Sequence, residues 1–489
     1  MASPSTLAPP SGSAAAAPAG EARIEARLWR IAFVLIFGAV LSMLDATIVS
    51  VGVESVAHSL HASLDTAQWF STGYLLAVSL VMPVSGWAAE RFGSKRAWMF
   101  AVAAFVVGSA LCGLAWSAAA LIVFRLLQGV GGALMQPIGQ AFLAQEAGPA
   151  RMGRMMGVIS LPVALAPVLG PIAGGLIVQH LDWRWMFWIN LPLGLATLLA
   201  AWRLLPQGSR VRGAATRLDV RGLALLSPGI GALVYGCSRA GAQAGPGSAQ
   251  VLLPLLAGVA LLLGYAVHAL RGRRVPLIDL RLFARRGFSV ATASSFLVGA
   301  SLYSSMLLVP LYYQEVRHAS VLQAGLLVVP QALGSAVAMV LGPRLGRRYS
   351  PRALMLGGVT LSLLGTIAFT QLASGPAGWV LALSLLLRGL GIGATMSPGM
   401  TAVFASVTRE QAPRASSALN VLNRIGGSLG TAVLVVVLGH GLAHQGRPVA
   451  AAYGGAFWWA LGLSALCLIP AALFPGRRQD APRWRRGPR

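Results

Sequence analysis

Charged residues are scarce in this chain, and acidic residues are the scarcest of all. Only 10% of the 489 residues are charged, with 13 Asp and Glu against 38 Lys and Arg, whereas 56% are hydrophobic. Soluble proteins carry about 25% charged residues, so this chain cannot cover a water-exposed surface, and its mean hydropathy is +0.71. The basic residues are dispersed between long apolar runs and form no continuous face for nucleic acid. The composition therefore predicts an integral membrane protein without a nucleic-acid partner.

Lysine, cysteine and histidine are also rare, and their placement excludes several enzyme classes. The one lysine, Lys95, is followed by Arg96, so the chain has no GxxxxGK[ST] loop and is not a P-loop ATPase. Cys112, Cys237 and Cys467 lie far apart in apolar segments, which argues against a disulfide framework or a CxxC metal site. The seven histidines form no HExxH motif, and the GxSG and YD/GxGD strings of intramembrane proteases do not occur. We expect no enzyme, no cofactor and no metal site.

Long apolar runs are what the sequence has in abundance. A transmembrane helix needs about 20 mostly apolar residues, and the continuous hydrophobicity of these runs favours helices over barrel strands. No small-residue cleavage site follows the first run, so we interpret it as a retained helix and not as a signal peptide. The runs predict an all-α polytopic membrane protein with fourteen spans, near residues 30–52, 68–89, 97–117, 119–143, 155–179, 185–205, 221–238, 250–270, 288–313, 321–343, 353–373, 379–404, 415–440 and 453–475.

The distribution of basic residues tests this number of helices. Of the 38 Lys and Arg, 31 fall in segments on the side of the N-terminus, four fall in loops on the opposite side, and three lie inside predicted helices. Basic residues concentrate in cytoplasmic loops, and one missed or extra helix would invert every later loop. The asymmetry therefore supports fourteen spans and predicts that both termini are cytoplasmic.

The sequence contains an internal repeat. The loop GWAAERFGSKR (86–96) has a degraded counterpart in PRLGRRYSPR (343–352), and QGVGGALMQP (128–137) is echoed by RGLGIGATMSP (388–398). Secondary transporters are often built from repeated halves with the substrate site between them. The repeat predicts five parts: a disordered cytoplasmic tail (1–28), a six-helix bundle (29–205), two inserted helices with basic linkers (206–286), a second six-helix bundle (287–475) and a basic cytoplasmic tail (476–489).

Four motifs resemble those of the major facilitator superfamily, in particular its fourteen-helix drug:proton antiporter branch. GWAAERFGSKR is similar to the loop motif GxLADRxGRR, and LIVFRLLQGVGGA (121–133) is similar to the RxxQGxGGA motif of helix four. APVLGPIAGG (166–175) resembles the antiporter motif of helix five, and LDATIVSV (44–51) with WRWMFWINLPLG (183–194) resembles the fourteen-helix branch. The resemblance covers about Arg30 to Pro475. It implies a monomeric multidrug efflux transporter of the bacterial cytoplasmic membrane, which exchanges amphipathic drugs or antibiotics for protons.

Two embedded charges carry the predicted coupling chemistry. A charge at the bilayer centre costs about 2.5–3.5 kcal/mol on insertion scales, so Asp45 and Arg125 need partners. Each lies roughly 10 Å below the outer boundary of its helix, at 1.5 Å per residue, so the two can face one another. We predict that Asp45 carries the proton and that Arg125 regulates it; the alternative is a structural ion pair that never titrates. Glu54 is a second candidate proton site or, alternatively, an exposed loop charge.

The remaining candidates concern conformational change and substrate binding. The helices contain one deep acid against three arginines, which argues against a doubly cationic substrate and favours a neutral or anionic amphiphile. A dedicated exporter, uniporter or importer of one metabolite is the alternative function. We expect the cavity to be lined by Gln128, Trp69, Tyr74, Arg388, Asn420 and Arg424, although the two aromatic residues also suit the membrane interface. The predicted latch and pivot, for which topological charge and close packing are the alternatives, comprise Gly86, Glu90, Arg91, Gly93, Arg96, Pro167, Gly170, Pro171, Gly174 and Gly175. Arg347 stands where a second latch would need an acid, so we expect one latch.

Overall fold

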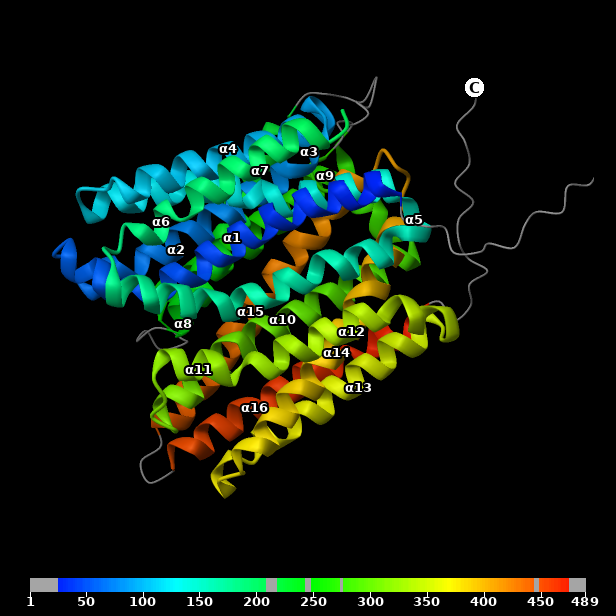
Figure 1. Cartoon of the computed structure of the whole chain (residues 1–489). Coiled ribbons are helices and arrows are strands. Elements are labelled where there is room, and N and C mark those ends of the chain that lie inside the picture. The colour runs from blue at the N-terminus through cyan, green and yellow to red at the C-terminus, as the bar shows by residue number, and fades with distance from the viewer. Residues whose placement is uncertain (1–24, 208–217, 242–247, 273–275, 444–447, 475–489) are drawn as a thin grey trace, which may run out of the picture.

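The computed structural model describes residues 25–207, 218–241, 248–272, 276–443 and 448–474, and within these ranges every regular element is a helix. The predicted tails at 1–28 and 476–489 lie outside the described residues, apart from 25–28. Figure 1 shows two stacks of roughly parallel helices, one formed by the first part of the chain and one by the last. The first stack contains α1 (Ala26–Ser59), α2 (Leu64–Val81), η1 (Met82–Val84), α3 (Ser85–Phe92), α4 (Ser94–Gly113), α5 (Ala118–His180), α6 (Trp185–Trp188) and α7 (Asn190–Leu204).

The second stack follows a helical hairpin. The hairpin is formed by α8 (Val220–Gly241) and α9 (Ala249–Arg271), and the short helix η2 (Leu280–Ala284) leads out of it. The second stack contains α10 (Arg286–Glu315), α11 (Val321–Leu327), α12 (Val329–Arg348), α13 (Pro351–Thr370), η3 (Leu372–Ser374), α14 (Gly378–Ala405), α15 (Ala412–Ala443), α16 (Val449–Leu466) and α17 (Leu468–Leu473).

Interruptions of the long helices coincide with proline and glycine. Pro83 lies in the 3₁₀ segment that separates α2 from α3, and Pro330 and Pro470 follow the breaks before α12 and α17. Proline removes a backbone donor and crowds the preceding turn, which explains these breaks. At Gly148 the backbone of α5 turns with φ 69° and ψ 168°, a conformation that glycine adopts without a Cβ clash. The loop predicted between the fourth and fifth spans is therefore a sharp turn at Gly148, where the two helices that make up α5 meet.

Twelve helices of the described residues are long and apolar enough to cross a membrane. A further apolar helix, Val220–Gly236, is shorter, and the part of α5 beyond Gly148 reaches His180. Every run predicted from the sequence is thus helical, which agrees with fourteen spans. The twelve helices make the chain a multi-pass membrane protein, and the full count of fourteen stays a prediction.

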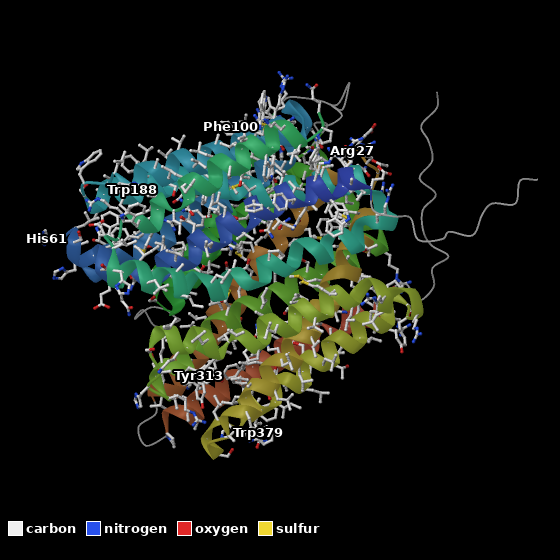
Figure 2. The ribbon with its side chains drawn as sticks, in the orientation of Figure 1. Arg27, His61, Phe100, Trp188, Tyr313 and Trp379 are labelled. Atoms are coloured by element: carbon white, nitrogen blue, oxygen red, sulfur yellow. The ribbon has the colours of Figure 1, made fainter. Side chains whose placement is uncertain are left out.

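The outer surface of the helices is apolar. Figure 2 shows Phe100 and Trp379 pointing away from the two stacks, and their exposed fractions are 62% and 71%. Exposed apolar side chains in such numbers are what the hydrocarbon of a bilayer requires. Arg27 and His61 lie near opposite ends of α1 in the same view, so charged and polar groups gather toward the helix ends.

The α8–α9 hairpin contacts both stacks. Helix α8 packs against α2 of the first stack and α15 of the second, and Ser227 Oγ donates a 2.5 Å hydrogen bond to the carbonyl of Leu80. Asp219 caps α8 by accepting from Gly222 N at 2.9 Å and lies 2.9 Å from His268 Nε2 of α9. The two inserted helices are therefore fastened to each other and cover one side of the junction between the stacks.

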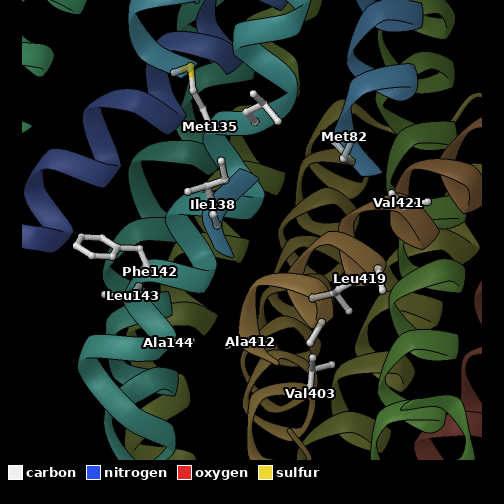
Figure 3. Packing of buried hydrophobic residues seen from close by; sticks show 14 of the residues in the cluster. Met82, Met135, Ile138, Phe142, Leu143, Ala144, Val403, Ala412, Leu419 and Val421 are labelled. Atoms are coloured by element: carbon white, nitrogen blue, oxygen red, sulfur yellow. The ribbon is translucent and has the colours of Figure 1, made fainter. Parts of the chain in front are cut away.

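The largest hydrophobic cluster joins the stacks. Figure 3 shows Ile138 and Phe142 on α5 at one side and Leu419 of α15 with Met82 above it at the other; the ring of Phe142 points away from Leu419. These residues are all nearly fully buried. The two six-helix bundles therefore share a core at this level instead of enclosing a continuous opening.

Candidate functional site

A fully buried carboxylate lies at the centre of the first stack. Asp45 of α1 has 0% exposure and accepts three hydrogen bonds from side chains. Arg125 Nη1 donates to Oδ2 at 2.6 Å, and Gln128 Nε2 and Asn190 Nδ2 each donate to Oδ1 at 2.8 Å. The three donors come from two other helices, α5 and α7, so one side chain ties three helices together.

Arg125 is equally enclosed. Its Nε donates to the carbonyl of Phe70 at 2.9 Å, and its Nη1 also donates to Gln128 Oε1 at 2.7 Å. The guanidinium carbon lies 4.3 Å from the centre of the Tyr74 ring, a cation–π contact. A buried charge is tolerable when it is paired and hydrogen-bonded, and Arg125 meets this condition through Asp45.

The local sequence explains how these groups come so close. In the segment QGVGGA, Gly129 faces α2 and Gly131 faces α4; a Cβ on Gly129 would lie 2.6 Å from the Cβ of Ala77, and one on Gly131 would overlap the backbone of Phe105. Gly108 of α4 lies against Gln128 in the same way, with a virtual Cβ 2.6 Å from its Cα. Small residues let membrane helices approach closely. The glycines therefore bring α2 and α4 against the turn of α5 that carries Arg125 and Gln128.

A cavity of about 280 Å³ lies between the stacks. The helices α1 and α5 of the first stack and α10, α12, α13, α14 and α15 of the second contribute its walls. Its polar groups are mainly amides and hydroxyls, and much of its surface is flexible methionine. The methionines are Met43, Met135, Met306, Met339, Met355, Met396 and Met400, and the amides are Gln136, Gln140, Gln331, Asn420 and Asn423.

Polar contacts close the junction at one end of the stacks, which we call the latch end. Arg414 of α15 donates to both carboxylate oxygens of Glu90 in α3, at 2.8 and 2.6 Å, and both side chains are about nine-tenths buried. Glu146 of α5 lies 3.3 Å from Arg409 and 2.7 Å from Arg27. The two stacks are therefore joined at this end by charged pairs that cross between them.

Neutral hydrogen bonds continue the closure toward the cavity. Ser416 Oγ donates to the carbonyl of Pro137 at 2.9 Å, and Asn420 Nδ2 donates to Gln140 Oε1 at 2.7 Å. Gly86 lies directly against the backbone of Arg414, where a Cβ would be 3.1 Å from its Cα. The absence of a side chain at Gly86 allows α3 to reach the second stack.

The model of the Major Facilitator Superfamily matches residues 35–431, most of the chain. The chain belongs to the Major Facilitator Superfamily. This is a superfamily of membrane transporters and not of enzymes, and the all-helical fold with its cavity between two bundles agrees with it.

Related transporters and solved structures support the same assignment. The chain is 37% identical over 426 residues to the multidrug resistance protein B homolog of Mycobacterium tuberculosis, covering 86% of this chain and 78% of that one. It is 32% identical to the tetracenomycin C resistance and export protein of Streptomyces glaucescens, covering 85% and 77%. The structure of the human organic anion transporter MFSD10 aligns with a TM-score of 0.63 and 19% identity, covering 91% and 99%.

The transporter's predicted cavity residues lie in different places. Of these six, Asn420 lines the cavity described above. Gln128 and Tyr74 belong instead to the surroundings of Arg125, and Trp69 stacks on Tyr235 of α8 with ring centres 6.3 Å apart. Hydropathy gives the depth of these residues in the membrane but not the rotation of their helices. For this reason all six were expected around the cavity.

The two remaining arginines also lie behind the cavity wall. Arg424 is half-buried and its guanidinium carbon is 5.7 Å from the centre of the Tyr303 ring, which does line the cavity. Arg388 of α14 is fully buried and donates from Nη2 to the carbonyl and hydroxyl of Ser301 at 3.0 and 3.1 Å. The cavity surface itself is therefore uncharged among the described residues that line it.

The predicted latch residues divide into two groups. Glu90 and Gly86 contact the second stack, whereas Arg91 and Arg96 are exposed. Gly93 has a φ of 84° and connects α3 to α4, so it supplies the tight turn that the motif predicts. The partner of Glu90 is Arg414, which the sequence placed in the distant loop before the thirteenth predicted span.

In the second part of α5, Gly170 and Gly174 pack on α1. A Cβ on Gly170 would overlap Thr47, and one on Gly174 would lie 3.0 Å from the carbonyl of Ile48. Gly175 has open space around it. The side chains of Pro167 and Pro171 lie outside the described residues. The helix-five motif therefore sits against the turn of α1 that follows Asp45.

Glu54 lies where its alternative interpretation put it, whereas Asn190 was missed. Glu54 is exposed near the end of α1 and apart from the Asp45 cluster. Asn190 was not singled out, although it is buried and donates to Asp45 at 2.8 Å and to Ser109 at 3.0 Å. A buried polar residue within the apolar segment WRWMFWINLPLG was the available signal, since such residues need partners in a membrane.

Proposed function

We propose that the protein is a proton-coupled antiporter that exports amphipathic drugs or antibiotics across the bacterial cytoplasmic membrane. The names of its relatives support the substrate class: a multidrug resistance protein B homolog, a tetracenomycin C resistance and export protein, and the multidrug export protein EmrB of Haemophilus influenzae, which is 31% identical. The cavity between the stacks, rich in methionine and amides, offers an adaptable apolar surface for such compounds.

The single observation that carries the coupling step is the enclosure of Asp45. Its carboxylate accepts from Arg125, Gln128 and Asn190 and is sealed from solvent. Protonation of Asp45 removes its attraction for Arg125 and turns one acceptor oxygen into a donor. The three helices held by this carboxylate then lose their common partner, so the free energy of their packing depends on the proton.

The proposed proton site at Asp45 and the cavity share the helices α1 and α5. Met43 lines the cavity two residues before Asp45 on α1, and Met135 lines it two turns after Gln128 on α5. A shift of α1 against α5 on protonation therefore moves two walls of the cavity. This links proton uptake to substrate release without direct contact between them.

The positions of the basic residues support a cytoplasmic location for the latch end and both termini. With the Glu90–Arg414 pair formed, the bundles are joined on the cytoplasmic side, the state from which an exporter would take up a proton. Rocking of the bundles about the cavity would then break this pair and expose the site inward. We expect the unit that performs this cycle to be a monomer.

The decisive experiment measures transport by purified protein in liposomes, with and without an imposed pH gradient. We expect pH-driven export of a fluorescent amphiphile, at least tenfold slower in Asp45→Asn because that side chain cannot exchange a proton. Glu54→Gln is the matched control on the same helix and should keep the wild-type rate. Undiminished, pH-dependent transport by Asp45→Asn would remove Asp45 from the coupling role.

The alternative is a dedicated exporter, uniporter or importer of one metabolite. The same liposomes distinguish these functions. A uniporter would transport equally fast without the pH gradient, an importer would move substrate in the opposite direction, and a dedicated exporter would accept one compound of a diverse panel.

A further inference from the structure

The second stack contains a buried arginine whose surroundings differ from those of Arg125. Arg388 of α14 has 0% exposure and occupies the position of Gln128 in the sequence repeat, where QGVGGALMQP is echoed by RGLGIGATMSP. Its Nη2 donates to the carbonyl and to the hydroxyl of Ser301 on α10. Its Nε and Nη1 are buried and have no hydrogen-bond partner among the described residues.

A serine pair, and not an acid, lies beside Arg388 among the described residues. Ser301 Oγ lies 2.7 Å from Ser464 Oγ of α16, and no described Asp or Glu forms an ion pair with Arg388. Arginine stays protonated in proteins, so its positive charge is uncompensated here. An unpaired buried charge costs several kcal/mol. The positive charge of Arg388 and its two free N–H donors therefore need a partner that is not a described side chain.

The arginine lies behind the cavity wall, next to residues that line the cavity. Ile392 lies one turn beyond Arg388 on the same face of α14 and lines the cavity, and so does Leu302, the residue after Ser301. No described residue that lines the cavity is Asp or Glu. A negatively charged group entering from the cavity would meet no carboxylate before it reached the guanidinium.

We propose that Arg388, Ser301 and Ser464 form a binding site for a monovalent anion, reached from the cavity. The site takes either the carboxylate of an acidic amphiphile or a small inorganic anion such as chloride. Arg388 supplies the charge and the free Nε and Nη1 donors. The two serine hydroxyls, which bond to each other and to the carbonyl of Ala460, hold its Nη2 in place. That the bound anion is the carboxylate of a transported substrate rests on the proposed function. That the site binds an anion does not depend on it.

The test measures the thermal unfolding of the full-length protein in detergent. Chloride, and separately benzoate, replaces gluconate, a large polyhydroxylated anion, at constant ionic strength. Ligands that bind the folded state raise the melting temperature in a saturable manner, and we expect a shift on the order of 2–4 °C. Saturable stabilisation by chloride identifies an inorganic anion and by benzoate a carboxylate; either supports the site, and stabilisation by neither overturns it.

Two variants locate the effect. Ser301→Asp places a carboxylate beside Arg388, as Asp45 lies beside Arg125, and should abolish the anion dependence while keeping the fold. Arg424→Gln removes the other embedded arginine of the second stack and should leave the dependence unchanged. An anion dependence that persists unaltered in Ser301→Asp would overturn the proposal, and so would its loss in Arg424→Gln.

A transport measurement then separates this proposal from the proposed function. In liposomes, wild-type protein should export an aromatic carboxylate at least tenfold faster than Ser301→Asp does, whereas both export the matching amide at similar rates. If neither compound is transported but chloride or benzoate still stabilises the wild type, the proposed function fails and the anion site stands. Equal transport of the acid by both proteins would exclude the carboxylate as the group that Arg388 binds.

Discussion

The two stacks solve the problem of a buried arginine in different ways. In the first, Arg125 is paired with Asp45 at 2.6 Å and has further partners at its Nε and Nη1. In the second, Arg388 binds Ser301 with one nitrogen and leaves Nε and Nη1 unpartnered among the described residues. The stacks are related by a sequence repeat, yet among the described residues a carboxylate pairs with the buried arginine of the first stack and not with that of the second.

This difference suggests a division of labour between the stacks. A carboxylate–guanidinium pair responds to protons, whereas an uncompensated guanidinium responds to anions. The α8–α9 hairpin and the latch end join the two stacks mechanically. A proton bound in one bundle and an anion bound in the other would then act on the same rocking motion.

The largest effect that tests this comparison is the loss of the Asp45 carboxylate. Asp45→Ala leaves Arg125 buried and unpaired, which should destabilise the protein by about 3–5 kcal/mol. Ser301→Ala removes a neutral acceptor from an arginine that already lacks an acid and should cost about 1 kcal/mol. Unfolding of both variants in detergent by denaturant gives the two values. Equal losses would show that the stacks do not differ in the way described.

A smaller effect concerns the latch that joins the stacks. Glu90→Gln removes the charge opposite Arg414, and we expect a loss of about 1.5–3 kcal/mol because both side chains are largely buried. The double variant Glu90→Gln with Arg414→Gln measures the interaction energy of the pair, as the difference between its loss of stability and the sum of the two single losses. If the losses of the single variants simply add, the two residues do not interact in solution.

The packing of α1 gives a third measurement. Gly170→Ala would force a Cβ into Thr47, near Asp45, and should destabilise the protein by about 1–3 kcal/mol. Gly175→Ala meets open space and serves as the control, where alanine is expected to be neutral or to stabilise by up to about 1 kcal/mol. Thermal unfolding of the two variants should show the difference. A destabilisation by Gly175→Ala as large as that by Gly170→Ala would contradict the described packing.

The smallest effect is expected at Glu54. This side chain is exposed near the end of α1, and surface substitutions usually change stability by less than about 0.5 kcal/mol. Glu54→Gln should therefore match the wild type in unfolding experiments, in contrast to Asp45→Ala on the same helix. A clear loss of stability would mean that Glu54 has a partner in solution.

The sequence was sufficient to predict where the helices lie. Continuous apolar runs predict each helical segment, and the glycine motifs predict close packing at Gly129 and Gly170, where a Cβ has no room. The scarcity of acids also singled out Asp45 and Arg125, because a charge in a membrane requires a partner. These features depend on residue type and on position along one chain.

Other features depend on how the helices are rotated about their axes, which hydropathy does not specify. Lipid and protein interior are both apolar. The sequence therefore gave the depth of Gln128 and Tyr74 in the membrane, but not that they lie beside Asp45 and Arg125 instead of at the cavity. The pairing of Glu90 with Arg414 and of Asn190 with Asp45 joins residues 324 and 145 positions apart. Composition and periodicity thus determined a membrane-spanning helical chain with one deep acid. Only the tertiary packing decided which polar side chains met, because Asp45, Arg125, Glu90 and Arg414 find their partners on other helices.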